Sequence, residues 1–433
     1  MSIKKLLIII YLIAGLIFLS HYTFSGHAIY GDGIDYWAYL PSVYFDHDID
    51  FSNQYKHYFE PVNNNLDNPG SALVVMKTAV TDIGKTDNVH PPGTAIVWSP
   101  AFIAADIAAV IFSLPRQGYS DIYQIFVGLW SIGVLTLGLW FNYQIVFRLI
   151  KDKNISLLSI FAIFLATPLL YYGAYDILNS HFASFSLTSV FWFVLLFLPN
   201  KPKTQILMGA IIGLATLIRL QEAMLLIPTI AFFLLKKRPL TGILNVFLTW
   251  LIFISPLFFI WEYLYGIPIP KQYIHIQTFV KRGNTLGSVF HPVYGIIRTP
   301  ILLLSLVGLK KFVTNYKNTA YLMAIYFLIQ FALVTLLRYW NGPAYGARAY
   351  ISTLPLFAIL IGYSIKVFSQ KFSFKLAVAV VSFLAILNII SISSFVLFEK
   401  DVNSGLKRGL EEKTQIKVDG IIKHSTDFLK SNK

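Results

Sequence analysis

Long apolar runs, most of them sufficient to cross a membrane, constrain the fold of this chain more than any other feature. Of its 433 residues, 56% are hydrophobic and only 13% are charged, whereas a soluble domain carries about 25% charged residues. A membrane-spanning helix needs about 20 mainly apolar residues. The sequence therefore predicts an all-α polytopic membrane protein. The apolar runs are Leu6–Ser20, Thr94–Leu114, Ile122–Ile150, Ser156–Tyr172, Phe182–Leu198, Gln205–Leu235, Gly242–Tyr263, Tyr294–Leu309, Ala320–Leu337, Tyr350–Ile365 and Leu376–Phe398.

The basic residues give the chain a formal net charge of +14. They lie in short clusters between the apolar runs, a pattern typical of topology signals and not of a phosphate-binding face, so no nucleic acid is expected as a partner. The chain has no cysteine, which excludes disulfides and thiol chemistry. Lys4 and Lys5 precede the first run, as in a signal peptide. No small-residue cleavage site follows, and we therefore expect an uncleaved first span.

The run Gln205–Leu235 is too long for a single span. As one helix it would measure about 46 Å, well beyond the thickness of the hydrocarbon layer. Basic residues flank both of its ends, and positive charge usually stays on the cytoplasmic side. We therefore expect a hairpin of two short spans with Arg219 at its outer tip, where an arginine avoids the hydrocarbon.

The run Thr94–Leu114 is predicted to lie on the outer surface of the membrane. Only then do all later basic clusters, beginning at Arg148, fall on the cytoplasmic side. About eleven spans result, with the N-terminus inside and the C-terminus outside. Residues 1–398 would form the transmembrane domain, in which residues 21–121 are a large first extracytoplasmic loop with juxtamembrane helices. Residues 399–433 would form a polar extracytoplasmic tail.

This topology places the acidic residues on one side of the membrane. Residues 21–93 contain nine acidic residues against three lysines, and Asp152 is the one acid that falls clearly in a cytoplasmic loop. Any chemistry is therefore expected on the extracytoplasmic face. The chain shows no internal repeat, which counts against a transporter because transporters often have internal symmetry.

The stretch "GDGIDYWAYLPSVYFD" directly follows the first span and begins an outer helix. Asp32 as N-cap and Asp35 at the third helical position would satisfy free backbone amides and favour the helix dipole. Alternatively, one of these carboxylates, which share a helix face, acts as a general base. Partial shielding from water at the membrane rim would raise its pKa into a useful range.

Two further motifs occur in the same outer segment. "DHDIDF" spaces Asp46, Asp48 and Asp50 like the start of a calcium loop, but it lacks the glycine and the glutamate that an EF-hand needs. Turn-forming aspartates are favoured, and a looser Mg²⁺ or Mn²⁺ site is the alternative. "HPPG" predicts a rigid turn into the surface helix, which leaves its histidine, His90, unexplained.

Three more polar side chains reach the outer face in this topology. In "YDILNSHFASF", Asn179 or Ser180 is a helix cap, and His181 in the first turn is either a packed aromatic or a ligand contact. "LIRLQEA" carries Arg219, and "RYWNGPAYGARAY" carries Arg348 in a loop that its glycines and proline make tight. Each arginine either anchors lipid headgroups or holds a phosphate with its planar fork.

These motifs occur in one order along the chain, together with "VFHPVYGIIRTPILLLSLVGL" and "YGARAYISTLPLF". Taken together, they resemble the GT-C superfamily of membrane glycosyltransferases over about residues 1–398. Relatives include protein O-mannosyltransferases and lipid A aminoarabinose transferases. The resemblance implies a GT-C-like fold with surface-lying helices in the first outer loop. It also implies transfer of a sugar, with inversion, from a polyprenyl-phosphate carrier to an acceptor hydroxyl outside the cytoplasm.

The resemblance further implies that Asp32, the acid after the first span, is the general base. Family members often carry two adjacent acids there, whereas here a glycine follows Asp32 and the next acid is Asp35. The choice between the two therefore stays open, and both are candidate catalytic residues. The candidate substrate-binding residues are His90, His181, Arg219, Arg348, Asp48 and Tyr345.

The expected partners are a polyprenyl-phosphate-linked sugar donor, an extracytoplasmic glycan, lipid or protein acceptor, and membrane lipids. No cofactor is certain, and a divalent cation, Mg²⁺ or Mn²⁺, stays open. The expected setting is a bacterial plasma membrane and the synthesis of cell-envelope glycans. The alternative function is a transporter or flippase of a lipid-linked or anionic solute, which predicts ionisable residues near the bilayer midplane. A non-catalytic scaffold is the third reading.

Overall fold

The computed structural model of the chain describes residues 2–59, 80–270, 290, 295–336 and 344–399. This part of the chain is helical and contains no β-strand beyond one isolated bridge between Val80 and Thr86. The predicted all-α fold class is confirmed. The predicted polar tail from residue 400 onwards and part of the loop that precedes Arg348 lie outside the described residues.

Apolar helices make up most of the described chain. Seven of them are long and apolar enough to cross a membrane, and four shorter segments accompany them. The helices are α1 (Ile3–Ser25), α2 (Asp32–Pro41), η1 (Ser42–Asp46), α3 (Ser52–Phe59), α5 (Gly93–Ile111), α6 (Asp121–Ile150), α7 (Lys153–Leu165), η3 (Tyr171–Tyr175), α8 (His181–Phe197), α9 (Pro202–Ile218), η4 (Leu220–Leu225), α10 (Leu226–Leu235), α11 (Leu240–Tyr265), η5 (Ile296–Arg298), α15 (Ile301–Asn315), α16 (Lys317–Leu336), η6 (Arg348–Thr353), α17 (Leu354–Lys371), α18 (Phe374–Ser394) and η7 (Phe395–Glu399).

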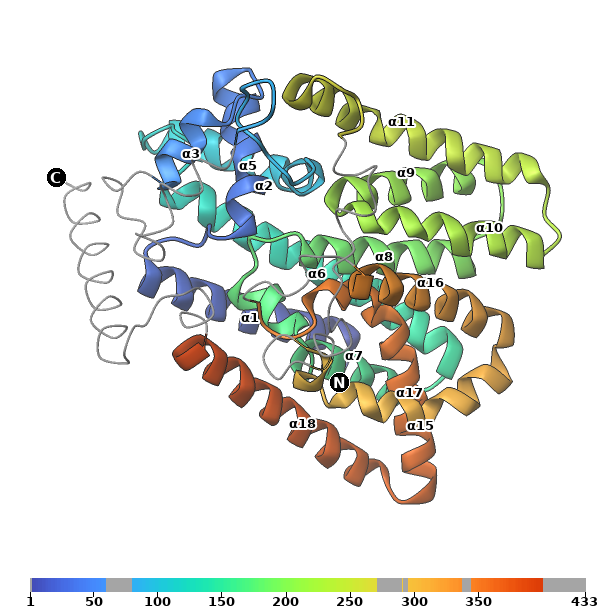
Figure 1. Cartoon of the computed structure of the whole chain (residues 1–433). Helices are drawn as coiled ribbons and strands as arrows, with labels where there is room; N and C mark the ends of the chain where they lie inside the picture. Colours follow the sequence, from blue (N-terminus) through green and yellow to red (C-terminus); the bar gives the residue numbers. More distant parts are fainter. Residues whose placement is uncertain (1, 60–79, 271–289, 291–294, 337–343, 400–433) are drawn as a thin grey trace.

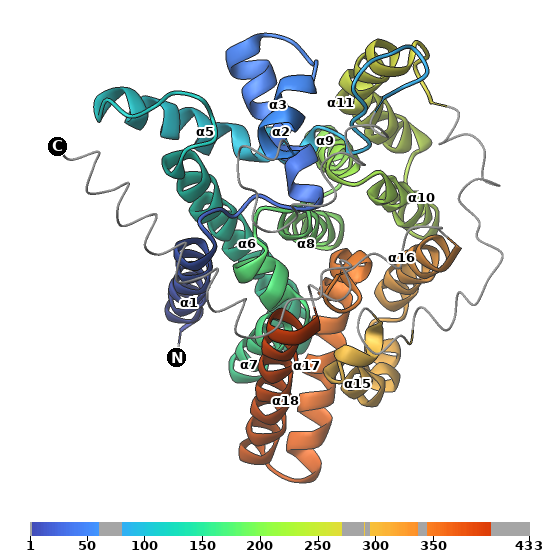
Figure 2. The same ribbon diagram turned by 60° about the vertical axis from the view of Figure 1, so that its left-hand side comes forward.

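The helices surround α8, which lies in the middle of the bundle, while α1, α11 and α18 lie at its edge (Figures 1 and 2). Several hydroxyl groups on α8 are buried and donate to carbonyls one turn earlier, as Thr188 does to Ser184 at 2.9 Å. Such bonds allow polar side chains to lie within an apolar interior. The edge helices expose large apolar side chains such as Ile252 and Phe383, which suits contact with lipid tails.

The long run Gln205–Leu235 is broken in two, as predicted. Helix α9 ends at Ile218, and Arg219 adopts an extended backbone with φ −148° and ψ 119°. A short 3₁₀ turn, η4, follows and leads into α10. The break leaves Arg219 at the end of two short apolar helices instead of inside one long helix.

The predicted first outer loop folds into short helices around the start of α5. Helix α2 packs against α3 and α5, and α5 also contacts α6 and α9. Within α5, Asp106 accepts hydrogen bonds from Tyr44, Arg116 and Tyr123, which ties α5 to η1 and α6. By length and composition α5 would also suit a span, so its placement on the membrane surface remains a prediction.

The "HPPG" turn leads into α5 as predicted, and its glycine marks a close helix contact. A Cβ atom at Gly93 would lie 2.3 Å from the backbone nitrogen of Ile218 and from the carbonyl carbon of Leu217. Only glycine lets the start of α5 approach the end of α9 so closely. This contact places the turn that carries His90 beside the break that carries Arg219.

Gly93→Ala is therefore expected to push α5 away from α9, at a cost of about 1–3 kcal/mol, because neither backbone can yield easily. The apparent melting temperature of the purified protein in detergent measures this effect. The matched control is Gly133→Ala on α6, where the nearest atom to a new Cβ would be 4.0 Å away. If both variants have the same apparent melting temperature as the unaltered protein, the tight contact at Gly93 is not part of the fold.

Candidate functional site

The candidate site begins at the first turn of α2. Gly31, with φ +55°, occupies the N-cap position, and no side chain caps the helix. The interpretation of Asp32 as an N-cap is therefore wrong, because Asp32 is the first helical residue and its carboxylate points to another segment. Gly33 lets this turn approach its neighbour, since a Cβ there would lie 2.5 Å from the carbonyl oxygen of Leu178.

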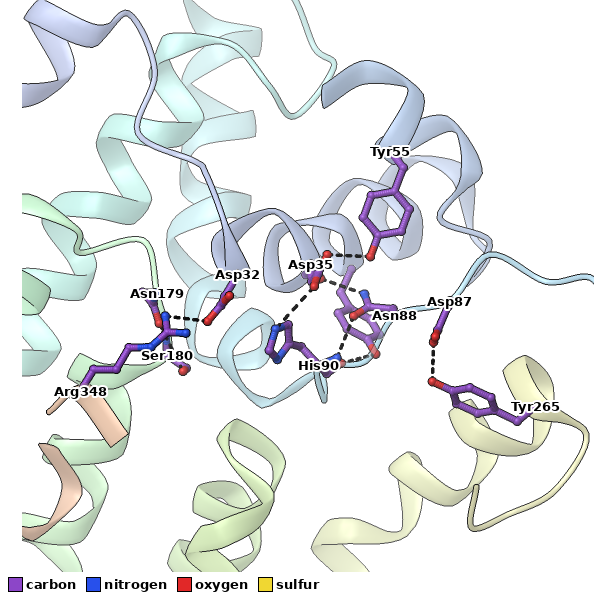
Figure 3. A network of polar contacts seen from close by, with 11 residues as sticks. Asp32, Asp35, Tyr55, Asp87, Asn88, His90, Asn179, Ser180, Tyr265 and Arg348 are labelled. Atoms are coloured by element: carbon purple, nitrogen blue, oxygen red, sulfur yellow. Dashed lines mark hydrogen bonds and ion pairs between the residues drawn. The ribbon is translucent and has the colours of Figure 1, made fainter. Parts of the chain in front are cut away.

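Asp32 forms an ion pair with Arg348, a residue far away in the sequence. Its Oδ2 lies 2.9 Å from Nη1 of Arg348, and the two side chains are 35% and 28% exposed. Arg348 opens the 3₁₀ turn η6, two residues after Gly346, whose φ is +57°. Figure 3 shows the two side chains meeting beside Asn179 and Ser180. A predicted base and a predicted phosphate ligand are therefore in direct contact.

Asp35, one turn further along α2, is held by a different set of groups. Tyr55 on α3 donates to its Oδ1 at 2.7 Å, and Nε2 of His90 lies 3.5 Å from its Oδ2. Asn88 bonds both to the carbonyl of Asp35 and to the backbone nitrogen of His90. His90, left unexplained by its motif, is thus part of a network around Asp35 (Figure 3).

The surroundings of the two aspartates shift their pKa values in opposite directions. Partial burial raises the pKa of Asp32, but the positive charge of Arg348, with His90 and Arg219 adding to it, brings the pKa below its usual range. For Asp35, burial outweighs the opposing effects of His90 and Tyr55, and its pKa is raised. Pairs of acids whose environments separate their pKa values are typical of catalytic sites.

Arg219 and His181 form a second contact pair. His181 is the first residue of α8, and its ring packs 4.6 Å from that of Tyr172. Nη1 of Arg219 lies 2.8 Å from Nδ1 of His181. Because a guanidinium can only donate, this ring nitrogen accepts the hydrogen bond and the imidazole is neutral there. His181 is thus both a packed aromatic and a partner of Arg219.

Gln221 connects the two arginine-bearing segments. Its amide nitrogen donates to Oε1 of Gln330 and to the carbonyl of Ala349, each at 3.0 Å. Nη2 of Arg219 donates to Oε1 of Gln221 at 3.3 Å. The neighbouring Glu222 is fully buried and accepts hydrogen bonds from Ser184 at 2.8 Å and from Tyr326 at 2.5 Å. These bonds fix the break after α9 against α8, α16 and η6.

Two predicted substrate-binding residues lie outside this cluster. Asp48 accepts hydrogen bonds from Ser42 Oγ at 2.8 Å and from the backbone nitrogen of Asp50 at 3.1 Å. This agrees with the preferred interpretation of "DHDIDF" as a turn. Tyr345 is fully buried; its hydroxyl donates to Asn388, and its carbonyl accepts from Tyr172. These bonds anchor the loop that carries Arg348 and do not bring Tyr345 to the Asp32 carboxylate.

Sequence reasoning missed Tyr55, Asn88 and Gln221 as members of the network. Asn88 and Gln221 each stand two residues from a predicted site residue, so proximity in sequence was a usable signal. No feature of the sequence singles out Tyr55 among the 25 tyrosines. Among the described residues, no group of three or more His, Asp or Glu side chains is arranged to hold a metal ion.

No protein-family model matches the chain, and no curated protein matches it. Among solved structures, the chain is similar to ArnT from Cupriavidus metallidurans bound to undecaprenyl phosphate. The TM-score is 0.53 with 13% sequence identity, and the match covers 96% of this chain and 75% of that chain. This similarity confirms the predicted polytopic all-α fold, and at such low identity it bears on the fold alone.

Proposed function

We propose that this chain is a membrane glycosyltransferase that moves a sugar from a polyprenyl-phosphate carrier to an acceptor hydroxyl, with inversion. The observation that carries the proposal is the meeting of Asp32 with Arg348, with Arg219 within electrostatic reach. A base and two phosphate-binding cations are thus gathered at one place. The shared fold supports a lipid-phosphate donor, because the similar protein was solved bound to undecaprenyl phosphate.

In the proposed reaction, the acceptor oxygen attacks the anomeric carbon of the donor sugar. Asp32 takes the proton from the acceptor hydroxyl as the new carbon–oxygen bond forms, which is general base catalysis. The bond between the anomeric carbon and the phosphate oxygen breaks on the opposite side, and the phosphate leaves with the bonding electrons. Attack opposite to the leaving group inverts the configuration of the sugar.

Arg348 and Arg219 stabilise the negative charge that develops on the leaving phosphate. Cations held in place before the reaction are usually the largest single contribution to catalysis. Gln221 helps to hold both arginines in place, because it accepts a hydrogen bond from the side chain of Arg219 and donates one to the carbonyl of Ala349, the residue after Arg348. The arginines are therefore held at a fixed spacing, as a phosphate-binding pair requires.

The remaining site residues position the reacting groups. Asp35 and His90 lie on the side of Asp32 away from Arg348, as Figure 3 shows, and we assign them to the acceptor or to the donor sugar. His181 is assigned to holding Arg219, which it contacts directly. Asp48 and Tyr345 take no part in the proposed chemistry.

The direction of the helices supports a site on the extracytoplasmic face. Helix α8 begins at His181 and leads towards Lys201, and α9 returns to Arg219. Helix α17 follows Arg348 through η6 and ends at Lys371. In each case the site lies at one end of the helices and a basic cluster at the other. Because basic clusters mark the cytoplasmic side, the site is assigned to the outside.

The pKa of Asp32 predicts how transfer depends on pH. A base must be deprotonated, so kcat/KM falls as the pH drops through this pKa. Arg348→Gln removes the positive charge that most strongly lowers the pKa of Asp32, so this pKa rises. The acid limb of kcat/KM is therefore expected to move up by about one pH unit or more. A pH series on both proteins measures the shift. An unmoved limb would assign the titration to another group, such as Asp35, whose pKa burial raises.

The proposal is tested by incubating the purified protein in detergent with a panel of polyprenyl-phosphate sugars and with glycan, lipid and peptide acceptors. Release of polyprenyl phosphate together with a glycosylated acceptor is the expected result. Detergent removes the membrane compartments, so a transporter or flippase would convert none of the donors. Sugar nucleotides serve as control donors and are expected to be inactive.

A further inference from the structure

In the structure, the two groups that the proposed reaction needs separately are bonded to each other. Oδ2 of Asp32 forms an ion pair with Nη1 of the Arg348 guanidinium at 2.9 Å. A carboxylate in this state is a weak base, because its proton-accepting oxygen faces a cation. A guanidinium in this state offers fewer donors to a phosphate. Both side chains are partly exposed, so a ligand can reach the pair.

A phosphate that binds to Arg348 competes with Asp32 for the same donor. Guanidinium groups bind carboxylate and phosphate with the same planar geometry. Two anions on one nitrogen would repel each other, so the donor phosphate and the Asp32 carboxylate cannot share this donor. Arg219 and His90 also lie within electrostatic reach of Asp32. The positive field that holds the carboxylate in the free protein is therefore the field that attracts a phosphate.

The backbone around the pair is held by contacts that do not involve either side chain. The close approach of Gly33 to the carbonyl of Leu178 fixes the start of α2. The segment of Arg348 is held by Gln221, through the Ala349 carbonyl, and by the Tyr345 anchor. Exchange of one anion for another therefore needs only side-chain rotation.

We infer that the lipid phosphate displaces Asp32 from Arg348, so that donor binding itself frees the base. This inference rests on the proposed function and adds an order of events to it. The acceptor is deprotonated only after the donor phosphate has taken over the guanidinium. Without a donor, Asp32 stays paired, and the site has no free base with which to activate water or an acceptor.

The inference predicts that removing the charge of Asp32 tightens phosphate binding while it removes the base. Asp32→Asn is expected to bind undecaprenyl phosphate in detergent about tenfold more tightly than the unaltered protein. An effect of this size is typical of two groups that interact directly. Asp32→Glu keeps the competing charge and is expected to bind as the unaltered protein does. Undecaprenol, which lacks the phosphate, serves as the control ligand and is expected to show no gain.

Two further variants separate the competition from a general change in charge. Asp87→Asn removes a negative charge elsewhere in the same loop, where Asp87 accepts a hydrogen bond from Tyr265, and is expected to leave the affinity nearly unchanged. In an Arg348→Gln background, Asp32→Asn is expected to bring no gain. Thermal unfolding of each variant establishes that it is folded.

Each outcome of this experiment has a defined meaning. If the unaltered protein binds undecaprenyl phosphate but Asp32→Asn binds it equally or more weakly, the exchange is overturned and the proposed function stands. An equal gain in the Arg348→Gln background, or in Asp87→Asn, also overturns the exchange. If neither the unaltered protein nor any folded variant binds the lipid phosphate, the proposed function falls and the inference falls with it.

Discussion

Asp32→Asn is expected to reduce the rate of sugar transfer by about a thousandfold, within the range that general base catalysis contributes. The amide has the shape of the carboxylate but cannot accept the proton of the attacking hydroxyl. The loss should appear in kcat, because the affinity for the donor phosphate is expected to rise and not to fall. Release of polyprenyl phosphate under saturating donor measures the effect.

Asp35→Asn is the matched comparison, because it makes the same chemical change one turn along the same helix. Asp35 is engaged by Tyr55 and His90 and not by Arg348. Its variant is expected to lose about tenfold at most, as for a positioning group whose amide keeps one hydrogen bond. If Asp35→Asn is inactive and Asp32→Asn retains transfer, the roles of the two carboxylates are reversed.

Arg219→Gln is expected to lower kcat/KM for the lipid-phosphate donor by about a hundredfold or more, the loss typical of removing one preorganised group that stabilises charge. The variant keeps polar atoms near His181 and Gln221 but removes the positive charge. Both binding of the donor phosphate and stabilisation of the leaving group depend on that charge. Steady-state kinetics with varied donor concentration provides the measurement.

Two substitutions make this prediction specific. Arg219→Lys keeps the charge but loses the planar fork, and an intermediate loss is expected because lysine binds phosphate as a point charge. Arg238→Gln removes an exposed arginine three residues beyond the end of α10, and it is expected to transfer sugar at the unaltered rate. An Arg219→Gln protein that is folded and fully active would remove Arg219 from phosphate binding.

Features set by hydrophobicity and charge were predictable from the sequence. The apolar runs follow directly from the thickness of a membrane, and the break in Gln205–Leu235 follows from its length and flanking charges. The position of Arg219 at that break was therefore predictable. The predicted cap, Asn179 or Ser180, includes the observed N-cap position Ser180, which places His181 in the first turn.

Features that depend on packing were not predictable from a single sequence. Local preference alone favoured Asp32 as a helix cap, but the structure places Arg348 within reach of its carboxylate, and the ion pair replaces the cap. No local pattern indicates which of the arginines predicted at the outer face lies next to α2. Tyr345 shows the same limit: nothing in the sequence indicates that its hydroxyl donates to Asn388 on α18.

The most direct test of this account is a cryo-EM map of the purified protein with undecaprenyl phosphate bound. The account predicts density for the phosphate between the side chains of Arg219 and Arg348, with Asp32 turned away from Arg348 and open to an acceptor. A phosphate that lies beyond hydrogen-bonding distance of both arginines, at a site remote from Asp32, would contradict it.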